Sequence, residues 1–201
     1  MIDYKKEKIL KRSFFERDTV LVAEELLGKV LVHKYNNILV SGRIVETEAY
    51  CGSDDLASHA AHKKSKRNSV MFGPVGHAYI YLIYGLHTCI NVVARAPEAA
   101  AGAVLIRALE PLEAIEFIEK QRNVRQSYNL TNGPGKIGQA FGISLNDTGV
   151  DMTNKEGHLY ILDAPALSQN NYTCSKRIGI TKNPDVLWRF FILNNPWVSR
   201  Y

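Results

Sequence analysis

The sequence has few cysteines, no long apolar run and no internal repeat, and each of these shortages excludes a class of protein. Its three cysteines, Cys51, Cys89 and Cys174, lie far apart and form neither a CxxC pair nor a Cys/His ligand spacing. A disulfide framework and a structural zinc site are therefore not expected. No segment approaches the ~18–20 apolar residues of a membrane span, and the charged residues 1–8 do not resemble a secretory signal. We expect a cytoplasmic protein that makes no membrane contact.

What the sequence does contain is typical of a globular domain. The 201 residues are 46% hydrophobic and 22% charged, which is enough apolar material for a sizeable core, and residues 1–201 are predicted to form a single domain. The formal net charge is +5. An excess of this size suits a polyanion such as nucleic acid or a membrane surface, but it is also common in proteins that bind neither.

Local signals predict an alternation of short helices and antiparallel strands. Asp18 and Gly28 mark the two ends of a helix over 19–27, and Pro111 is expected to open a helix over 112–122. A further short helix should end near Gly142. The predicted strands are 29–35, 38–50, 78–83, 88–93, 104–109, 159–163 and 188–193, with turns at Asn36-Asn37 and near Gly85. Because regular helical crossovers between strands are missing, the pattern favours an antiparallel or mixed sheet with helices packed around it.

Two glutamates and a tyrosine share one face of the predicted strand 38–50. Residues two apart on a strand point the same way, so Glu46, Glu48 and Tyr50 lie together. Such a face is most often simply solvated. If it lines a pocket instead, a carboxylate beside an aromatic ring is suited to general-base catalysis on a stacked base.

A pair of histidines precedes a run of positive charges. His59 and His62 have the i, i+3 spacing that can bind a metal, but no Glu follows the first histidine as in HExxH, so surface or packing roles are the commoner outcome. The loop after them carries four cations, Lys63, Lys64, Lys66 and Arg67. Runs of this kind are usually only solvated, yet this one precedes an aromatic hairpin in a basic protein. That juxtaposition is consistent with contacts to phosphates.

The predicted hairpin 78–93 is rich in tyrosine. Tyr79 and Tyr81 share a face and have the pattern of core residues, whereas Tyr84 falls at the tip, where a large ring is hard to bury. A ring in that position could act as a wedge between base pairs. Arg107 interrupts an apolar strand and therefore needs a partner, for which Glu48 is a candidate.

Taken together, these features resemble the alkyladenine (3-methyladenine) DNA glycosylase family in its short bacterial form. The resemblance covers nearly the whole chain and is carried by residues 42–50, 67–68, 71–72, 79–85, 89–91, 107–113, 133–136 and 196–199. It implies an α+β domain with a curved sheet surrounded by helices and a protruding hairpin that inserts into DNA. It also implies a monomer that works in the cytoplasm on the nucleoid.

The activity implied by the resemblance is the first step of base excision repair. The enzyme would hydrolyse the N-glycosidic bond of a flipped-out alkylated or deaminated purine in double-stranded DNA and leave an abasic site. The implied substrates are 3-methyladenine, 7-methylguanine, hypoxanthine and ethenoadenine. No metal or organic cofactor is expected, and because no lysine is placed beside Glu48 in the sequence, we expect a monofunctional hydrolase.

The resemblance also assigns roles to individual residues. Glu48 matches the base that activates the water, and Arg107 with the backbone carbonyl of Ile178 would help to hold that water. The residues implied to contact the flipped base are Tyr50, His59, Tyr81 and Asn91, of which Asn91 would exclude the 2-amino group of guanine. Tyr84 matches the intercalating residue. The expected contacts to the DNA backbone are Lys63, Lys64, Lys66, Arg67 and Lys136.

Parts of the chain depart from the family pattern, and two other functions stay open. Residues 86–88 differ from the usual hairpin loop, and 123–130 and 146–155 match poorly. One alternative is a nucleic-acid-binding module without catalysis, in which Glu48 is a surface residue. The other is a metal hydrolase that uses His59, His62 and Glu48.

Overall fold

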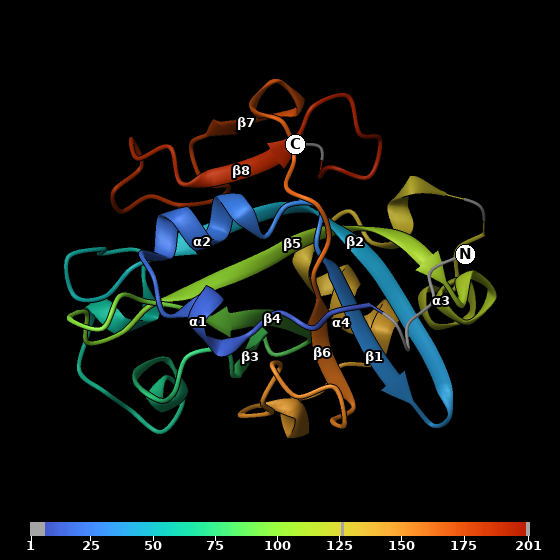
Figure 1. The fold of residues 1–201 in the computed structure, drawn as a ribbon, viewed down its shortest axis with the longest axis horizontal. Helices are drawn as coiled ribbons and strands as arrows, with labels where there is room; N and C mark the ends of the chain where they lie inside the picture. The colour runs from blue at the N-terminus through green and yellow to red at the C-terminus, as the bar shows by residue number, and fades with distance from the viewer. Residues whose placement is uncertain (1–6, 126, 200–201) are drawn as a thin grey trace.

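The computed structural model describes residues 7–125 and 127–199, which fold around one eight-stranded sheet (Figure 1). The strands are β1 (Val30–Tyr35), β2 (Ile38–Tyr50), β3 (Ala78–Ile83), β4 (His87–Val93), β5 (Ala103–Glu113), β6 (Leu159–Leu162), β7 (Tyr172–Ser175) and β8 (Arg189–Ile192). Six of them follow the order β3-β4-β5-β2-β1-β6, and β8 joins β2 to β7. Each of these strand pairs is antiparallel, which settles the choice between an antiparallel and a mixed sheet.

The helices are short and lie against the sheet. They are α1 (Arg12–Phe15), α2 (Thr19–Glu25), α3 (Ile115–Arg122) and α4 (Pro134–Phe141). Single 3₁₀ turns are η1 (His59–Ala61), η2 (Ser69–Phe72), η3 (Tyr128–Leu130), η4 (Leu145–Asp147) and η5 (Gln169–Asn171). Helix α2 packs on β2 and β5, while α4 packs on β4 and β5. Within the described ranges, no helix has both the length and the apolar character needed to cross a membrane.

Strand β2 has three neighbours because it is 13 residues long and forks along its length. Its first half pairs with β1, and the stretch Glu46–Glu48 pairs with β8 instead. Strand β5 runs beside it from Ser41 to Tyr50, with register shifts around Glu46. The two glutamates therefore lie in the middle of the sheet, with a strand on each side.

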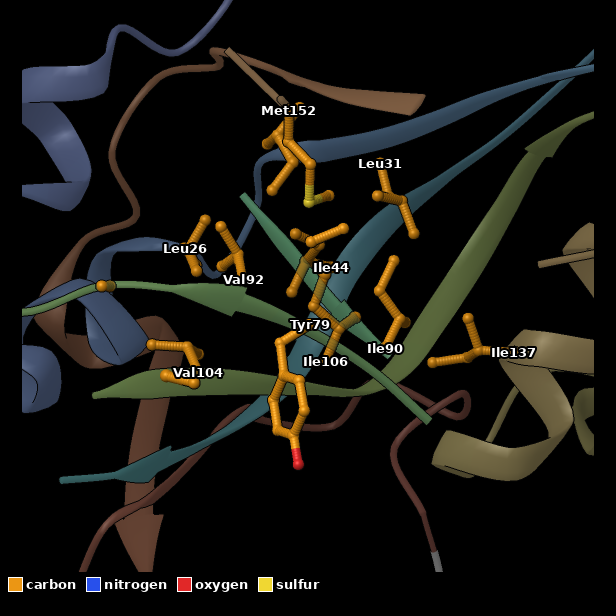
Figure 2. Close-up of a cluster of buried hydrophobic side chains, with 14 of the residues drawn as sticks. Leu26, Leu31, Ile44, Tyr79, Ile90, Val92, Val104, Ile106, Ile137 and Met152 are labelled. Atoms are coloured by element: carbon orange, nitrogen blue, oxygen red, sulfur yellow. The ribbon is translucent and has the colours of Figure 1, made fainter. Parts of the chain in front are cut away.

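The core lies between the sheet and the helices that cover it. Figure 2 shows part of it, including the fully buried residues Leu31, Ile44, Ile90 and Ile106. Tyr79 is among them and is 1% exposed, and its hydroxyl points out of the apolar cluster. Tyr79 therefore belongs to the core through its ring and places its hydroxyl at the border of the core, 2.7 Å from His59 Nδ1.

Most predicted elements are confirmed, and one helix start is wrong. Asp18 accepts hydrogen bonds from the N–H groups of Val20 and Leu21 at the start of α2, and the Asn36-Asn37 turn has positive φ at both residues. Pro111, however, continues β5 opposite Gly42 rather than opening a helix. The helix α3 begins only after Ala114, whose φ of 59° turns the chain out of the sheet. Strand β7 and helix α1 were not predicted.

Candidate active site

The centre of the sheet holds two buried carboxylates and two buried arginines. Glu46 and Glu48 on β2 are both 0% exposed. Arg107 on β5 donates from Nε to Glu46 Oε1 (3.1 Å) and from Nη1 to Glu48 Oε2 (3.1 Å). From the other side, Arg189 on β8 donates to Glu46 Oε1 (2.6 Å). Two positive and two negative charges thus balance, as buried charges require. The predicted partnership of Arg107 with Glu48 is confirmed, although the face is not solvated.

The two glutamates differ in what else they bind. Glu46 also accepts from the backbone N–H and the hydroxyl of Ser199 at 2.8 and 2.7 Å, so both its oxygens are engaged by groups of the sheet and the C-terminal segment. Glu48 accepts from the Tyr50 hydroxyl on Oε2 (2.7 Å) and from the Ile178 N–H on Oε1 (2.7 Å). Strand parity could not separate the two residues, whereas these partners do.

A cavity of about 590 Å³ opens next to Glu48. Three partners of Glu48, namely Tyr50, Arg107 and Ile178, line it. The other lining residues are Ala57, His59, Arg67, Met71, Tyr79, Tyr81, Leu82, Ile83, Tyr84, Gly85, Cys89, Asn91, Leu105, Pro134, Gly179 and Ile180. The carboxylate therefore lies directly behind a cavity whose wall is rich in aromatic rings.

The aromatic side chains form a connected group inside this cavity. The ring of His59 meets that of Tyr81 edge to face at a centroid distance of 4.6 Å, and the rings of Tyr79 and Tyr81 are 5.6 Å apart. His59 Nδ1 lies 2.7 Å from the Tyr79 hydroxyl. Burial, and secondly the charge of Arg67, hold the pKa of His59 below 6.5, so the ring is uncharged at neutral pH. Burial and the Glu48 carboxylate raise the pKa of Tyr50, which keeps its hydroxyl as a donor.

Asn91 reaches the cavity from β4. Its side chain is 3% exposed, and its Nδ2 donates to the backbone carbonyl of Tyr79 on the neighbouring strand at 2.9 Å. This hydrogen bond fixes the direction of the amide in the cavity wall. Beside it, Cys89 lines the same wall, and burial raises the pKa of its thiol to about 11, so it stays protonated.

The tip of the β3–β4 hairpin is exposed and has an unusual backbone. Tyr84 is 89% exposed and has a φ of 53°, and Gly85 follows with a φ of 70°. Positive φ is uncommon for a bulky residue, and where it persists the surrounding structure has to stabilise it. Tyr84 also lines the mouth of the cavity. The fold thus exposes a large ring beside the entrance rather than burying it.

The cationic residues predicted to contact DNA fall in two different environments. Lys63, Lys64, Lys66 and Arg67 are exposed, and a second cleft of about 440 Å³, lined by Lys63 and Arg67 among others, shares His59 and Arg67 with the cavity. Arg67 also lies 5.5 Å from the ring of Tyr81. Lys136 on α4 is instead half-buried and donates to the side-chain oxygens of Asn129 and Asn132.

Comparison with known proteins identifies the family of this chain. The sequence profile of the methylpurine-DNA glycosylase family matches residues 13–196. The chain belongs to the methylpurine-DNA glycosylase family. A relative from Chlorobium phaeobacteroides is 46% identical over 193 residues, covering 96% of this chain and 97% of its own length. Relatives from Methanoculleus marisnigri and Clostridium tetani are each 44% identical and cover 95% of this chain and 98% of their own. All three are provisionally named 3-methyladenine DNA glycosylases.

In this methylpurine-DNA glycosylase family member, most residues that the sequence singled out converge. Glu48 and Ile178 are 130 positions apart and share a hydrogen bond. The contact to Glu48 is made by the backbone N–H of Ile178, whereas the resemblance implies a role for its carbonyl in holding the water. His62 is exposed and lines only the second cleft. Among the described residues, His59, His62 and Glu48 do not form a group of potential metal ligands, which removes the geometric basis of the metal-hydrolase alternative.

Sequence reasoning missed the residues that hold this site from behind. Asp55 and Arg177 are both buried, and the guanidinium donates to the two carboxylate oxygens at 2.6 and 2.8 Å. Arg177 also donates to the Ala49 carbonyl (2.9 Å), and its Cζ lies 4.7 Å from the centroid of the Tyr50 ring. The position of Arg177 next to Ile178 was the only signal in the sequence that pointed to it.

Proposed function

We propose that the chain is a monofunctional DNA glycosylase that hydrolyses the bond between a damaged purine and its deoxyribose after the nucleotide has been flipped into the cavity. One observation carries the proposal: Glu48 is buried behind an aromatic cavity and is bound by three of the groups that line it. An ionised carboxylate aimed by a phenol, a guanidinium and a backbone N–H is suited to act as a general base toward water.

The charge balance supports this reaction. Cleavage of an N-glycosidic bond passes through an oxocarbenium-like state in which the sugar becomes positive. Alkylated purines are also cationic before they leave. Arg107 alone would repel both, but Glu46 pairs with Arg107 and with Arg189. We infer that Glu46 offsets one of the two arginine charges, so that the cluster around Glu48 is neutral rather than positive next to the reacting centre.

The cavity wall supports selection of purines by stacking and shape. Flipping a nucleotide costs a few kcal/mol, least for a damaged pair, and stacking on an aromatic side chain returns about 1–3 kcal/mol per base. We infer that Tyr50, Tyr81 and His59 stack the base and that Tyr84 enters the DNA duplex in the gap left by the flipped nucleotide. We propose 3-methyladenine, 7-methylguanine, hypoxanthine and ethenoadenine as substrates. No described residue lining the cavity is a lysine, which favours attack by water over a Schiff base.

The test is a matched pair of substitutions, Glu48→Gln and Glu46→Gln. We expect Glu48→Gln to lower single-turnover base release by about 10²–10⁴-fold, the range of general acid–base catalysis, while lesion-duplex binding is nearly unchanged. Glu46→Gln should lower the Tm more, because one acceptor position and the charge that pairs with Arg107 and Arg189 are lost, yet it should lower base release less. Both variants are assayed well below their Tm values by detection of abasic sites.

Two outcomes would reject the proposal. If wild-type protein binds lesion duplex without producing abasic sites, the chain is a binding module. If Glu46→Gln is folded but inactive and Glu48→Gln is active, the general base has been assigned to the wrong residue.

A further inference from the structure

A second group of polar side chains meets away from the proposed cavity, where β1, η4 and the segment before β6 come together. His33, Asp147 and His158 each offer one ligand atom, and these atoms all lie within 4.8 Å of one another. His158 Nε2 is 2.8 Å from Asp147 Oδ1, and the rings of His33 and His158 have centroids 5.7 Å apart. None of the three lines the cavity beside Glu48.

His33 is held in the tautomer whose Nε2 can bind a metal ion. Its Nδ1 lies 2.7 Å from the backbone carbonyl oxygen of Phe141. Because a carbonyl oxygen only accepts, Nδ1 carries the proton and the neutral ring keeps the lone pair on Nε2. Among the residues that the structure describes, this Nε2 has no hydrogen-bond partner. A histidine whose other ring nitrogen donates to a backbone carbonyl is the usual arrangement in metal sites.

The carboxylate of Asp147 is oriented in a similar way. Its Oδ2 accepts from the backbone N–H of Ser144 at 2.7 Å and from the Ser144 hydroxyl at 3.3 Å. These bonds cap η4 and turn Oδ1 toward His158. The outer contacts that fix the two buried ligands are therefore in place.

We propose that His33, Asp147 and His158 bind a divalent transition-metal ion, with Zn²⁺ as the best match to two imidazole nitrogens and one carboxylate oxygen. Imidazole suits first-row transition metals, and zinc accepts this donor set in a tetrahedral geometry. Ligand atoms around a tetrahedral ion with bonds of roughly 2.0–2.2 Å lie about 3.3 Å apart. The side chain of His158 is 48% exposed, so it can move from its 2.8 Å contact with Asp147 Oδ1 to this spacing, and its exposed side leaves a fourth position to solvent.

A bound ion would link β1 to η4, which is itself attached to the edge strand β3. Directly after Asp147, Thr148 donates from its hydroxyl to the carbonyl of Ile80 (3.2 Å), and the Gly149 N–H donates to the carbonyl of Ala78 (2.8 Å). Both carbonyls belong to β3. The inference does not depend on the proposed glycosylase chemistry, and it can fail without affecting it.

The experiment measures binding of Zn²⁺ and Co²⁺ to the whole metal-free chain. We expect one saturable Zn²⁺ site that raises the Tm, and visible d–d bands with Co²⁺ that report tetrahedral ligation. His158→Ala should weaken Zn²⁺ binding by about 100-fold or more, since even changes to the outer contacts of metal ligands cost roughly 10–100-fold. Its fold should be kept because the side chain is half-exposed. His62→Ala and Cys174→Ser remove other exposed metal-binding groups and should leave the affinity unchanged.

The results that overturn the proposal are equally defined. Wild-type protein with no saturable Zn²⁺ binding rejects it, as does His158→Ala with wild-type affinity. Loss of binding in His62→Ala or Cys174→Ser, with His158→Ala unaffected, assigns the metal to a different place. His33→Phe provides a second check, because the ring volume is retained while the nitrogen ligand is lost and the Co²⁺ bands should disappear.

Discussion

At the scale of single residues, Asn91 combines a structural and a proposed selective role. Its Nδ2 donates to the carbonyl of Tyr79, and its side chain forms part of the cavity wall. A normal guanine differs from hypoxanthine by a 2-amino group, so a fixed amide in the wall can exclude guanine by collision. Shortening this side chain changes the space available without changing the stacking rings.

We therefore expect Asn91→Ser to raise guanine excision modestly relative to hypoxanthine excision. The lost hydrogen bond to Tyr79 should cost about 0.5–1.5 kcal/mol of stability. Single-turnover rates on hypoxanthine and guanine duplexes give the ratio, and a thermal melt gives the stability. An unchanged ratio with both rates reduced would assign Asn91 a structural role only.

The residue scale also shows where sequence reasoning stops. Alternation along a strand placed Glu46 and Glu48 on one face, and the structure brings both to Arg107. What distinguishes the two is contributed by Arg189, Ser199 and Ile178, which lie 143, 153 and 130 residues away in the chain. No local pattern encodes contacts of that separation.

At the scale of elements, the β3–β4 hairpin presents Tyr84 in a conformation that folding alone does not favour. The ring is 89% exposed, so it contributes little to the core. Tyr84→Ala should weaken lesion-duplex binding by roughly 5- to 150-fold, because stacking is worth about 1–3 kcal/mol, while the Tm changes little. Ile38→Ala is the matched control, since Ile38 is an exposed apolar residue (38%) beside the turn of the other hairpin. A large fall in Tm for Tyr84→Ala, or equal binding losses in both variants, would contradict the wedge.

The segment around Ile178 is held by Asp55 through Arg177. Asp55→Asn removes the charge partner of a buried guanidinium, so the Tm should fall and the Ile178 N–H should lose its fixed position next to Glu48. We expect single-turnover base release to drop about tenfold or more, with a smaller change in lesion affinity. Asp163→Asn breaks another ion pair, with Lys29, and should lower stability without slowing base release. Equal rates for the two variants, measured below both Tm values, would remove the positioning role of Asp55.

Elements were predictable wherever a local signal specified them. Asp18 as a cap and Asn36-Asn37 as a turn are such signals, and the structure bears them out. The predicted start of α3 was wrong because proline is common in the first turn of a helix and is also tolerated in edge strands and at β-bulges. Strand β7 escaped prediction because Tyr172–Ser175 is only four residues long and depends on β8 for pairing.

At the scale of the whole molecule, the net charge of +5 is informative because of where the positive side chains lie. Lys63 and Arg67 line the cleft that adjoins the cavity, and Lys64 and Lys66 are exposed on the same loop. Replacing Lys64 and Lys66 with Gln should weaken binding to lesion and undamaged duplexes alike. The slope of log K against log salt should become shallower by about 0.9 per lost phosphate contact. The same double change at exposed Lys8 and Lys120 should leave the slope unaltered, and a shift of equal size there would show that only total charge matters.

The forked strand β2 has a consequence for how the protein is made. Glu46 and Glu48 are synthesised early, and Arg107 follows, but Arg189 and Ser199 come at the end of the chain. Before β8 has been synthesised, Glu46 and Glu48 can pair with Arg107 but not with Arg189, so the charges of this cluster cannot balance as they do in the folded protein. Strand β8 therefore has to pair with β2 before the cluster becomes neutral. Contacts of such long sequence separation form slowly, so we expect the site to be completed only when β8 and Ser199 pack against β2.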